Sequence, residues 1–190
     1  MLRPALETLR RSELERVLDD WPTTARDDQL PPHVWAGADA RQRGWHLWLI
    51  LGGRGSGKTR AGAEWVRCQL RGRPPIAHQP ARRIALVGPT YHEAAAVMVE
   101  GVSGLLAVMG RARPVFNKAA RKLIFYNGAV AQLFSGEDPE ELRGPQFDAA
   151  WCDELAKWRY PDHTLDMLTL GVTGYIGGRS LEKVVESWKR

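Results

Sequence analysis

The segment from Trp48 to Thr59 constrains this chain more than any other. It reads WLILGGRGSGKT, an apolar run that ends in Gly-x-x-x-x-Gly-Lys-Thr, the Walker A pattern. The pattern is typical of a buried strand, a phosphate-binding loop and the first turn of a helix, because glycines let backbone N–H groups converge on an anion at a helix N-terminus. We therefore expect a nucleotide polyphosphate to bind eight residues: Gly52, Gly53, Arg54, Gly55, Ser56, Gly57, Lys58 and Thr59.

Two residues of this loop have specific expected roles. Lys58 should reach the β- and γ-phosphates, and the hydroxyl of Thr59 should ligate Mg²⁺. The alternative is a glycine-rich turn that happens to precede Lys-Thr. The apolar run at residues 45–51 and the helical pattern at 59–70 favour nucleotide binding over that alternative.

Apolar runs and helical patterns alternate along the rest of the chain. A second strand is predicted at residues 83–87, a helix at 93–109, a hairpin around an Asn-Gly turn at 122–134, and a further strand at 147–154. An amphipathic helix at 2–20 and a polar linker come before them. This alternation predicts an α/β fold with a mainly parallel central sheet, and 190 residues suffice for one core.

Two adjacent carboxylates, Asp153 and Glu154, end the apolar run at 147–152. Beside a phosphate-binding loop, Asp153 would be the Walker B residue that holds the Mg²⁺ shell, and Glu154 would polarise the water that attacks the γ-phosphorus. The alternative is a strand end with two solvated acids. The presence of both motifs favours the Walker B interpretation over that alternative. The adjacent Glu154 in turn favours ATP hydrolysis over phosphoryl transfer, because transfer requires an acceptor hydroxyl rather than an activated water.

Three further side chains are candidates for contacts with the nucleotide. Arg54, within the loop, and Arg143, ahead of the second motif, are expected to stabilise charge on the transferring phosphoryl group, in cis and from a neighbouring subunit respectively. Gln29 carries two donors and an acceptor with which it can read adenine. The alternatives are ordinary surface arginines and a solvated loop glutamine.

Composition narrows the classes of partner. The net charge of +5 and pairs such as Arg82/Arg83 suit contact with a DNA backbone, although solvated charged loops explain them as well. Cys68 and Cys152 form no disulfide framework, and the five histidines show no metal-ligand spacing. No apolar stretch approaches the ~20 residues of a membrane span, and we expect no contact with a membrane.

Several stretches together resemble the ATPase domain of the large terminase subunit, the DNA-packaging motor of tailed phages and phage-like gene transfer agents. They are QLPP at 29–32, the segment 48–67, VGPT at 87–90, LRGP at 142–145 and WCDELAKW at 151–158. The resemblance implies a P-loop NTPase of the ASCE type that hydrolyses ATP in the bacterial host cytoplasm. It also implies a homo-oligomeric ring that acts on double-stranded DNA with a portal protein and a small terminase subunit. In that family, arginines at the places of Arg54 and Arg143 are proposed cis and trans activators.

The resemblance divides the chain into three parts. Residues 1–44 form an N-terminal helix and linker, 45–170 the ATPase core, and 171–190 a divergent tail with a short helix at 180–190. The family continues into a strand with a coupling motif and then a nuclease domain, neither of which is visible here. We therefore expect a C-terminally truncated chain without nuclease activity, whose incomplete sheet exposes an apolar edge and makes the chain marginally stable or prone to associate.

Two other functions remain open from the sequence. A helicase-like, nucleic-acid-stimulated ATPase shares the same core, although no strand-separation motif follows Glu154. A non-catalytic remnant that binds nucleotide or docks on packaging partners is favoured by the missing coupling strand.

Overall fold

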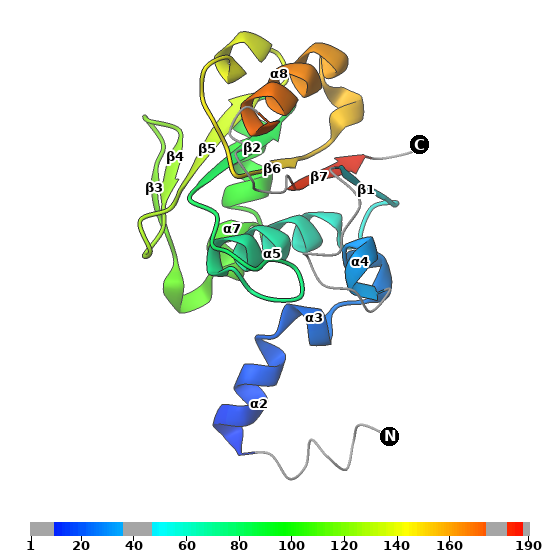
Figure 1. Cartoon of the computed structure of the whole chain (residues 1–190), viewed down its shortest axis with the longest axis vertical. Coiled ribbons are helices and arrows are strands. Elements are labelled where there is room, and N and C mark those ends of the chain that lie inside the picture. The colour runs from blue at the N-terminus through cyan, green and yellow to red at the C-terminus, as the bar shows by residue number, and fades with distance from the viewer. Residues whose placement is uncertain (1–9, 36–46, 174–181, 188–190) are drawn as a thin grey trace.

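A computed structural model describes residues 10–35, 47–173 and 182–187 of the chain. Its centre is a seven-stranded sheet in the order β1-β7-β6-β2-β5-β4-β3 (Figure 1). Five neighbouring strands are parallel: β1 (Trp48–Leu51), β7 (Glu182–Ser187), β6 (Ala149–Cys152), β2 (Arg83–Gly88) and β5 (Val130–Ser135). The strands β4 (Lys122–Ile124) and β3 (Val115–Asn117) continue the sheet antiparallel. The predicted α/β fold with a mainly parallel sheet is confirmed.

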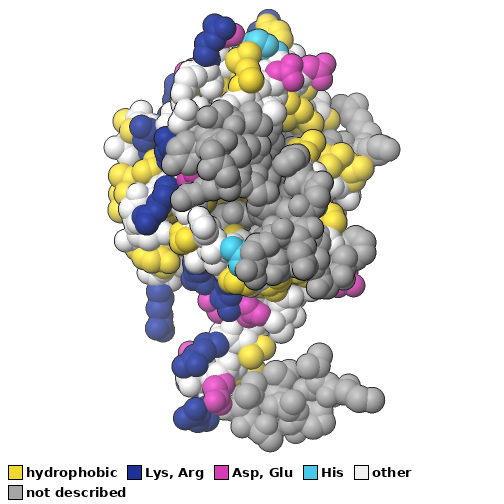
Figure 2. Space-filling view, viewed as in Figure 1, with side chains coloured by type: hydrophobic (Ala, Val, Ile, Leu, Met, Phe, Trp, Pro, Cys, Tyr) yellow, Lys and Arg dark blue, Asp and Glu magenta, His cyan; other side chains and the backbone are white. Residues whose placement is uncertain are grey.

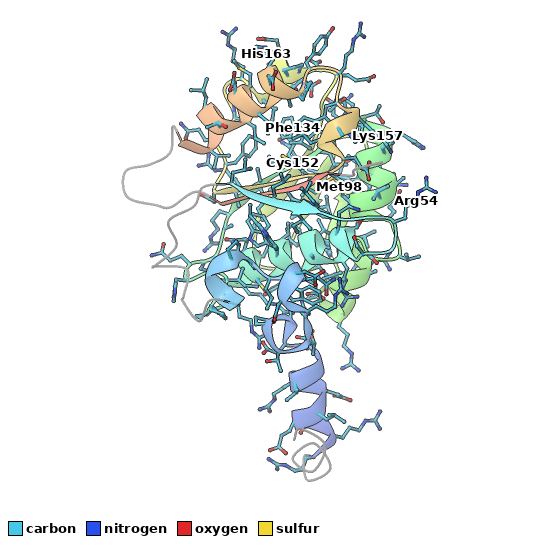
Figure 3. All side chains as sticks on the ribbon, turned by 90° about the vertical axis from the view of Figure 1, so that its right-hand side faces the viewer. Arg54, Met98, Phe134, Cys152, Lys157 and His163 are labelled. Carbon is cyan, nitrogen blue, oxygen red and sulfur yellow. The ribbon has the colours of Figure 1, made fainter. Side chains whose placement is uncertain are left out.

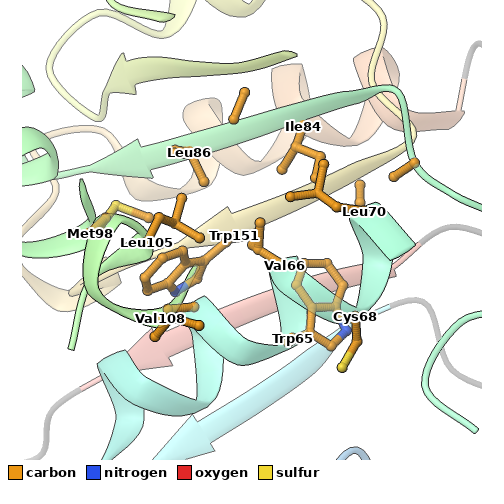
Figure 4. Packing of buried hydrophobic residues seen from close by; sticks show 14 of the residues in the cluster. Trp65, Val66, Cys68, Leu70, Ile84, Leu86, Met98, Leu105, Val108 and Trp151 are labelled. Carbon is orange, nitrogen blue, oxygen red and sulfur yellow. The ribbon is translucent and has the colours of Figure 1, made fainter. Parts of the chain in front are cut away.

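Helices cover both faces of the sheet (Figure 1). On one face lies α5 (Lys58–Arg71), with α7 (Leu105–Val108) beside it, and on the other lies α8 (Pro161–Thr173). Alternation along β2 explains the two layers, because Ile84 and Leu86 point toward α5 while Ala85 and Val87 join the core under α8. Figure 4 shows the first core, in which Trp65 of α5 and Trp151 of β6 are both buried.

The predicted helical tail at 180–190 is wrong for the residues that the structure describes. Residues 182–187 form β7, and Val184 pairs with Trp48 of β1 on one side and Trp151 of β6 on the other. The strand therefore lies between the phosphate-loop strand and the acidic strand, where the sequence predicted an incomplete sheet. Glu and Lys favour a helix locally, but two flanking strands offer hydrogen bonds on both sides and override that preference.

The N-terminal part is a chain of short helices below α5 (Figure 1). Of the helix predicted at 2–20, α2 (Arg11–Leu18) is confirmed, and residues 1–9 lie outside the described part. The predicted polar linker covers residues 23–44, of which 36–44 lie outside the described part. Three short helical elements, the first beginning at residue 21, occupy the described portion. They are α3 (Trp21–Thr24), the 3₁₀ helix η1 (Asp27–Gln29) and α4 (Pro32–Trp35).

The helix predicted at 93–109 is broken into pieces. A single turn, α6 (Tyr91–Glu93), leads into a π-helix, η2 (Ala94–Val99), and α7 follows only after a turn at residues 100–104. Gly101 and Gly104 are poor helix formers, which accounts for the interruption. Short 3₁₀ helices η3 (Gly110–Ala112), η4 (Pro139–Leu142) and η5 (Leu155–Lys157) complete the elements. The hairpin of β4 and β5 is confirmed, whereas β3 was not predicted.

Candidate nucleotide-binding site

A cleft of about 490 Å³ opens at the carboxyl ends of the parallel strands. The segment 54–60, which joins β1 to α5, forms one wall, and residues from the π-helix and the following turn form another. Glu154 and Lys157, from the segment after β6, complete the lining. Figure 3 shows Arg54 and Lys157 at the same end of the sheet. The volume lies within the range of small-molecule sites.

The loop between β1 and α5 curls around its own lysine. The Lys58 Nζ atom donates to the carbonyl oxygen of Gly52 at 2.7 Å and to that of Gly53 at 3.2 Å. Gly57 caps α5 in the left-handed conformation with a φ of +86°, and Gly55 has a φ of +75°. Lys58 and Thr59 are the first two residues of a 14-residue helix, whose N-terminus favours an anion.

Asp153 and Glu154 follow β6, and their surroundings differ from each other. Asp153 is 4% exposed, its N–H donates to Val87 O at 2.8 Å, and its carbonyl accepts from Trp158 Nε1 at 2.9 Å. Glu154 has a φ of +52°, and its carboxylate lies 3.6 Å from Lys157 Nζ. The structure brings Glu154 to the cleft wall, whereas Asp153 is buried behind it and is not among the lining residues.

The two candidate arginines lie in different places. Arg54 lines the cleft. Arg143, just after η4, has a 74% exposed side chain that pairs with Glu140 at 3.2 Å. It lines a separate cavity of about 210 Å³, formed with Pro145 and the end of α8. The structure therefore does not bring Arg143 to the phosphate loop of the same chain.

Gln29 contacts the phosphate loop itself. Its side chain is buried at 8% exposure, and its Nε2 donates to Gly57 O at 3.3 Å. Its Oε1 accepts from the backbone N–H of Arg26 at 3.3 Å, and Arg26 Nη2 donates to Ser56 O at 2.6 Å. Sequence reasoning missed Arg26, because one arginine in a polar segment gives no signal. It also missed Lys157 and the wall formed by residues 96–103.

Other site types find no support within the described residues. Across residues 10–35, 47–173 and 182–187, no group of three or more His, Cys, Asp or Glu side chains could hold a metal ion. In the same part of the chain, no helix is both long and apolar enough to cross a membrane. Figure 2 shows Lys and Arg side chains along one side of the visible face and over α2, interleaved with apolar side chains.

The parallel sheet, the loop around Lys58 and the cleft at the carboxyl ends of the strands define a P-loop NTPase fold. The family model described as "Terminase large subunit, T4likevirus-type, N-terminal" matches residues 49–178, well over half of the chain. The chain therefore belongs to the terminase large subunit family and corresponds to its N-terminal region.

Solved structures agree with this fold. The large terminase of a thermophilic bacteriophage superposes with a TM-score of 0.61 at 15% identity, over 84% of this chain and 38% of that one. The same phage protein in complex with ADP gives 0.55 at 18% identity, over 72% of this chain and 33% of that one. The ATPase domain of the large terminase from Thermus phage P74-26 gives 0.55 at 18% identity, over 95% of this chain and 71% of that one.

The chain thus spans little more than a third of the first of these terminases. A comparison with curated proteins gives no match.

Proposed function

We propose that this chain is the ATP-hydrolysing motor domain of a terminase large subunit. One observation carries the proposal: Glu154 lines the same cleft as Lys58 and Thr59, although about 95 residues separate them in sequence. A carboxylate can orient or deprotonate an attacking water only within hydrogen-bond reach of it, so a shared cleft is the first requirement.

ATP and Mg²⁺ are the cofactors that this site fits. The convergent loop and the N-terminus of α5 suit a polyphosphate, and Lys58 suits its β- and γ-phosphates. Mg²⁺ takes one or two protein oxygens and completes its shell with phosphates and water. The Thr59 hydroxyl, which lines the cleft, is such a donor, and the Asp153 carboxylate, buried behind the cleft wall, would act on the ion through a water of its shell. The bound ion would neutralise charge on the phosphates.

We propose a role in hydrolysis or nucleotide binding for each of the other four candidate side chains. Glu154 orients the attacking water, and Arg54, at the cleft, offsets charge on the phosphoryl oxygens in cis. Arg143 lies outside the cleft of its own chain, and we propose that it acts on the nucleotide of a neighbouring subunit. Gln29 is proposed to contact the adenine, in addition to its hydrogen bond to Gly57 O of the phosphate loop.

The wider role is proposed from the family. A ring of such subunits would drive double-stranded DNA into a phage-like capsid in the host cytoplasm, with the portal protein and the small terminase subunit as partners. The net charge of +5 supports contact with a polyanion. Because the chain spans only 38% of the first phage terminase that it matches, these partners belong to the proposal for the whole protein.

ATP hydrolysis by the purified chain, with and without double-stranded DNA, tests the proposal. Glu154→Gln should reduce turnover by about 100-fold or more while ADP still binds. Glu15→Gln on α2, far from the cleft, is the matched control and should hydrolyse at the wild-type rate. Binding without turnover in the wild type would instead support the non-catalytic remnant. Full turnover in Glu154→Gln would remove this residue from the mechanism.

A further inference from the structure

Arg26 and Gln29 contact two successive peptide groups of the phosphate loop from outside the cleft. Arg26 Nη2 donates to Ser56 O at 2.6 Å, and Gln29 Nε2 donates to Gly57 O at 3.3 Å. Arg26 is not among the residues that line the cleft. Its contact with the loop is therefore made through the loop's outer side.

Peptide geometry gives these contacts a consequence for the inner side. In a planar trans peptide, the carbonyl and the N–H of the next residue point in opposite directions. A donor that holds Ser56 O therefore fixes the direction of the Gly57 N–H. The direction of the Lys58 N–H is fixed by two donors to Gly57 O, the Gln29 amide and the Ala61 N–H of α5, the latter at 2.9 Å. These amides lie at the N-terminus of α5, where backbone N–H groups bind anions. The guanidinium also polarises the peptide that it contacts.

The guanidinium of Arg26 is itself held in place. Its Nε and Nη2 atoms donate to the two carboxylate oxygens of Asp28, at 2.9 Å and 3.1 Å. This two-point contact fixes the plane of the group and leaves one Nη2 hydrogen for Ser56 O. Asp28 belongs to η1, which also carries Gln29, so one short element presents both contacts.

The segment that carries Arg26 is anchored to the helix that follows the loop. Asp19 pairs with Arg67 and Arg71 in the second half of α5, and Asp20 pairs with Arg73 at 2.8 Å. Trp21 is 7% exposed and belongs to the core on that side of the sheet. The segment therefore contacts the loop–helix unit at both ends, and the Arg26 side chain needs no large rearrangement to reach Ser56.

From these contacts we infer that Arg26 is a positioning residue for nucleotide binding, which aligns the Ser56–Gly57 peptide with the help of Gln29. The inference rests on the proposed function, because it names how the same site is arranged for the phosphates. It also means that the Gln29 amide supports the loop, beyond any contact with adenine. Arg26 acts through the backbone of Ser56 and Gly57 and has no part in the chemical step.

The test compares Arg26→Ala, Arg26→Lys and Asp28→Asn with Arg11→Ala. Arg11 is a matched control because it also forms an exposed, local ion pair, with Glu15 at 3.3 Å, but touches no loop. In nucleotide-free protein, the Ser56 N–H donates to Gly53 O at 3.3 Å and the Ala61 N–H to Gly57 O at 2.9 Å, and hydrogen exchange of these two amides should be several-fold faster in Arg26→Ala. The affinity for Mg-ADP should fall roughly 10-fold, because nucleotide binding must then also order a loop that Arg26 no longer preorganises. Arg26→Lys and Asp28→Asn should give smaller changes in the same direction.

The outcomes separate this inference from the proposed function. A wild-type chain that binds no Mg-ADP overturns the proposed function, while exchange at Ser56 and Ala61 still reports on Arg26. Unchanged exchange at both amides in Arg26→Ala overturns the positioning role. Faster exchange with unchanged Mg-ADP affinity also overturns it. An equal loss of affinity in Arg11→Ala would show that any lost surface charge has the same effect, which again contradicts the inference.

Discussion

The Glu154 carboxylate lies 3.6 Å from the Lys157 ammonium, and both side chains line the cleft that contains the phosphate loop. Glu154 is held in the left-handed backbone conformation, with a φ of +52°. Among the described non-glycine residues, only Arg121 shares a positive φ. This conformation costs a residue such as Glu about 1 kcal/mol or more. The residue proposed to orient the water is therefore also a site of backbone strain.

This strain predicts different melting temperatures for two inactive variants. Glu154→Gln and Glu154→Asn should both lose turnover by about 100-fold or more, since neither carries a carboxylate. Asn tolerates the left-handed conformation better than Gln does, so Glu154→Asn should melt about 2–4 °C above Glu154→Gln. Thermal unfolding followed by circular dichroism measures this difference. Identical melting curves for the two variants would contradict the assignment of strain to Glu154.

Alanine substitutions at three glycines of the phosphate loop should lower the free energy of unfolding by different, increasing amounts. A Cβ at Gly53 meets nothing within 4 Å, so Gly53→Ala should leave the free energy of unfolding nearly unchanged. Gly55→Ala meets no atom but has a φ of +75°, which should cost about 1 kcal/mol. Gly57→Ala combines a φ of +86° with a Cβ only 2.4 Å from Gln29 Nε2, and should cost the most.

A double variant separates the two causes at Gly57. Gln29→Ala removes the close contact but leaves the backbone conformation, so the pair Gly57→Ala/Gln29→Ala should recover only part of the lost stability. Urea titrations of the four variants and of Gln29→Ala alone provide the comparison. If Gly57→Ala costs no more than Gly55→Ala, the Gln29 amide moves aside without cost, and its hydrogen bond to Gly57 O does not stabilise the fold.

The elements predicted correctly from the sequence are those whose signal is local. The β1–α5 unit is specified by an apolar run, a glycine loop and a helical period that follow one another directly, and the β4–β5 hairpin by its Asn-Gly turn. The strand β7 was missed because its strand conformation depends on the flanking β1 and β6, which local propensity does not represent.

The residues of the site also fall into those with a local sequence signal and those positioned by distant parts of the chain. Glu154 and Lys58 were predicted because each belongs to a motif of fixed spacing, and the structure brings both to one cleft. Arg26 reaches Ser56 because Asp19 anchors the segment before it to α5 and Asp20 anchors that segment to Arg73, just after the helix. Contacts between segments 30 residues apart, made by a single side chain, leave no pattern in the sequence.

Helix α5 carries a buried ion pair that should matter for stability. Glu64 is 1% exposed and contacts Arg67 at 2.6 Å and Arg60 at 2.6 Å. Arg67→Ala leaves only the half-exposed Arg60 to compensate the buried Glu64 carboxylate and also removes the contact with Asp19, so it should lower the free energy of unfolding by about 3 kcal/mol. The exposed pair of Arg11 and Glu15 is the control, and Arg11→Ala should cost less than about 0.5 kcal/mol. Urea denaturation measures both. Equal costs would show that the Glu64 pair is not effectively buried.

The contact of Asp19 with α5 predicts a dependence of stability on acid. Partial burial raises the pKa of the Asp19 carboxyl, but hydrogen bonds from Arg67 and Arg71 and the charges of these residues outweigh it, so the pKa lies below its ordinary value of 3.8. The unfolded chain then binds this proton more readily than the folded chain does. The stabilisation is therefore complete above about pH 5 and is lost as the pH falls below 3.8 through the folded-state value.

Comparison of wild type with Asp19→Asn isolates this effect. The free energy of unfolding, measured by urea titration from about pH 6 to about pH 3, should fall more steeply in the wild type. The difference between the two proteins should shrink toward the acid end, because the wild-type carboxyl becomes neutral there as well. Parallel curves across this range would mean that Asp19 does not titrate with folding.

A proline in β7 tests the most unexpected feature of the fold. Val184 lies in a strand that is paired on both sides, with Trp48 and Trp151 as its partners in register. Proline lacks the N–H and does not fit the interior of a sheet, so Val184→Pro should lower the free energy of unfolding by about 3 kcal/mol or more. Val184→Thr keeps the N–H and the branched β-carbon, and should cost far less. If residues 182–187 formed a helix outside the sheet, β1 and β6 would not depend on this segment for their pairing. Neither variant would then disturb the sheet. Similar urea midpoints for Val184→Pro and the wild type would therefore contradict the placement of this strand between the two motifs of the site.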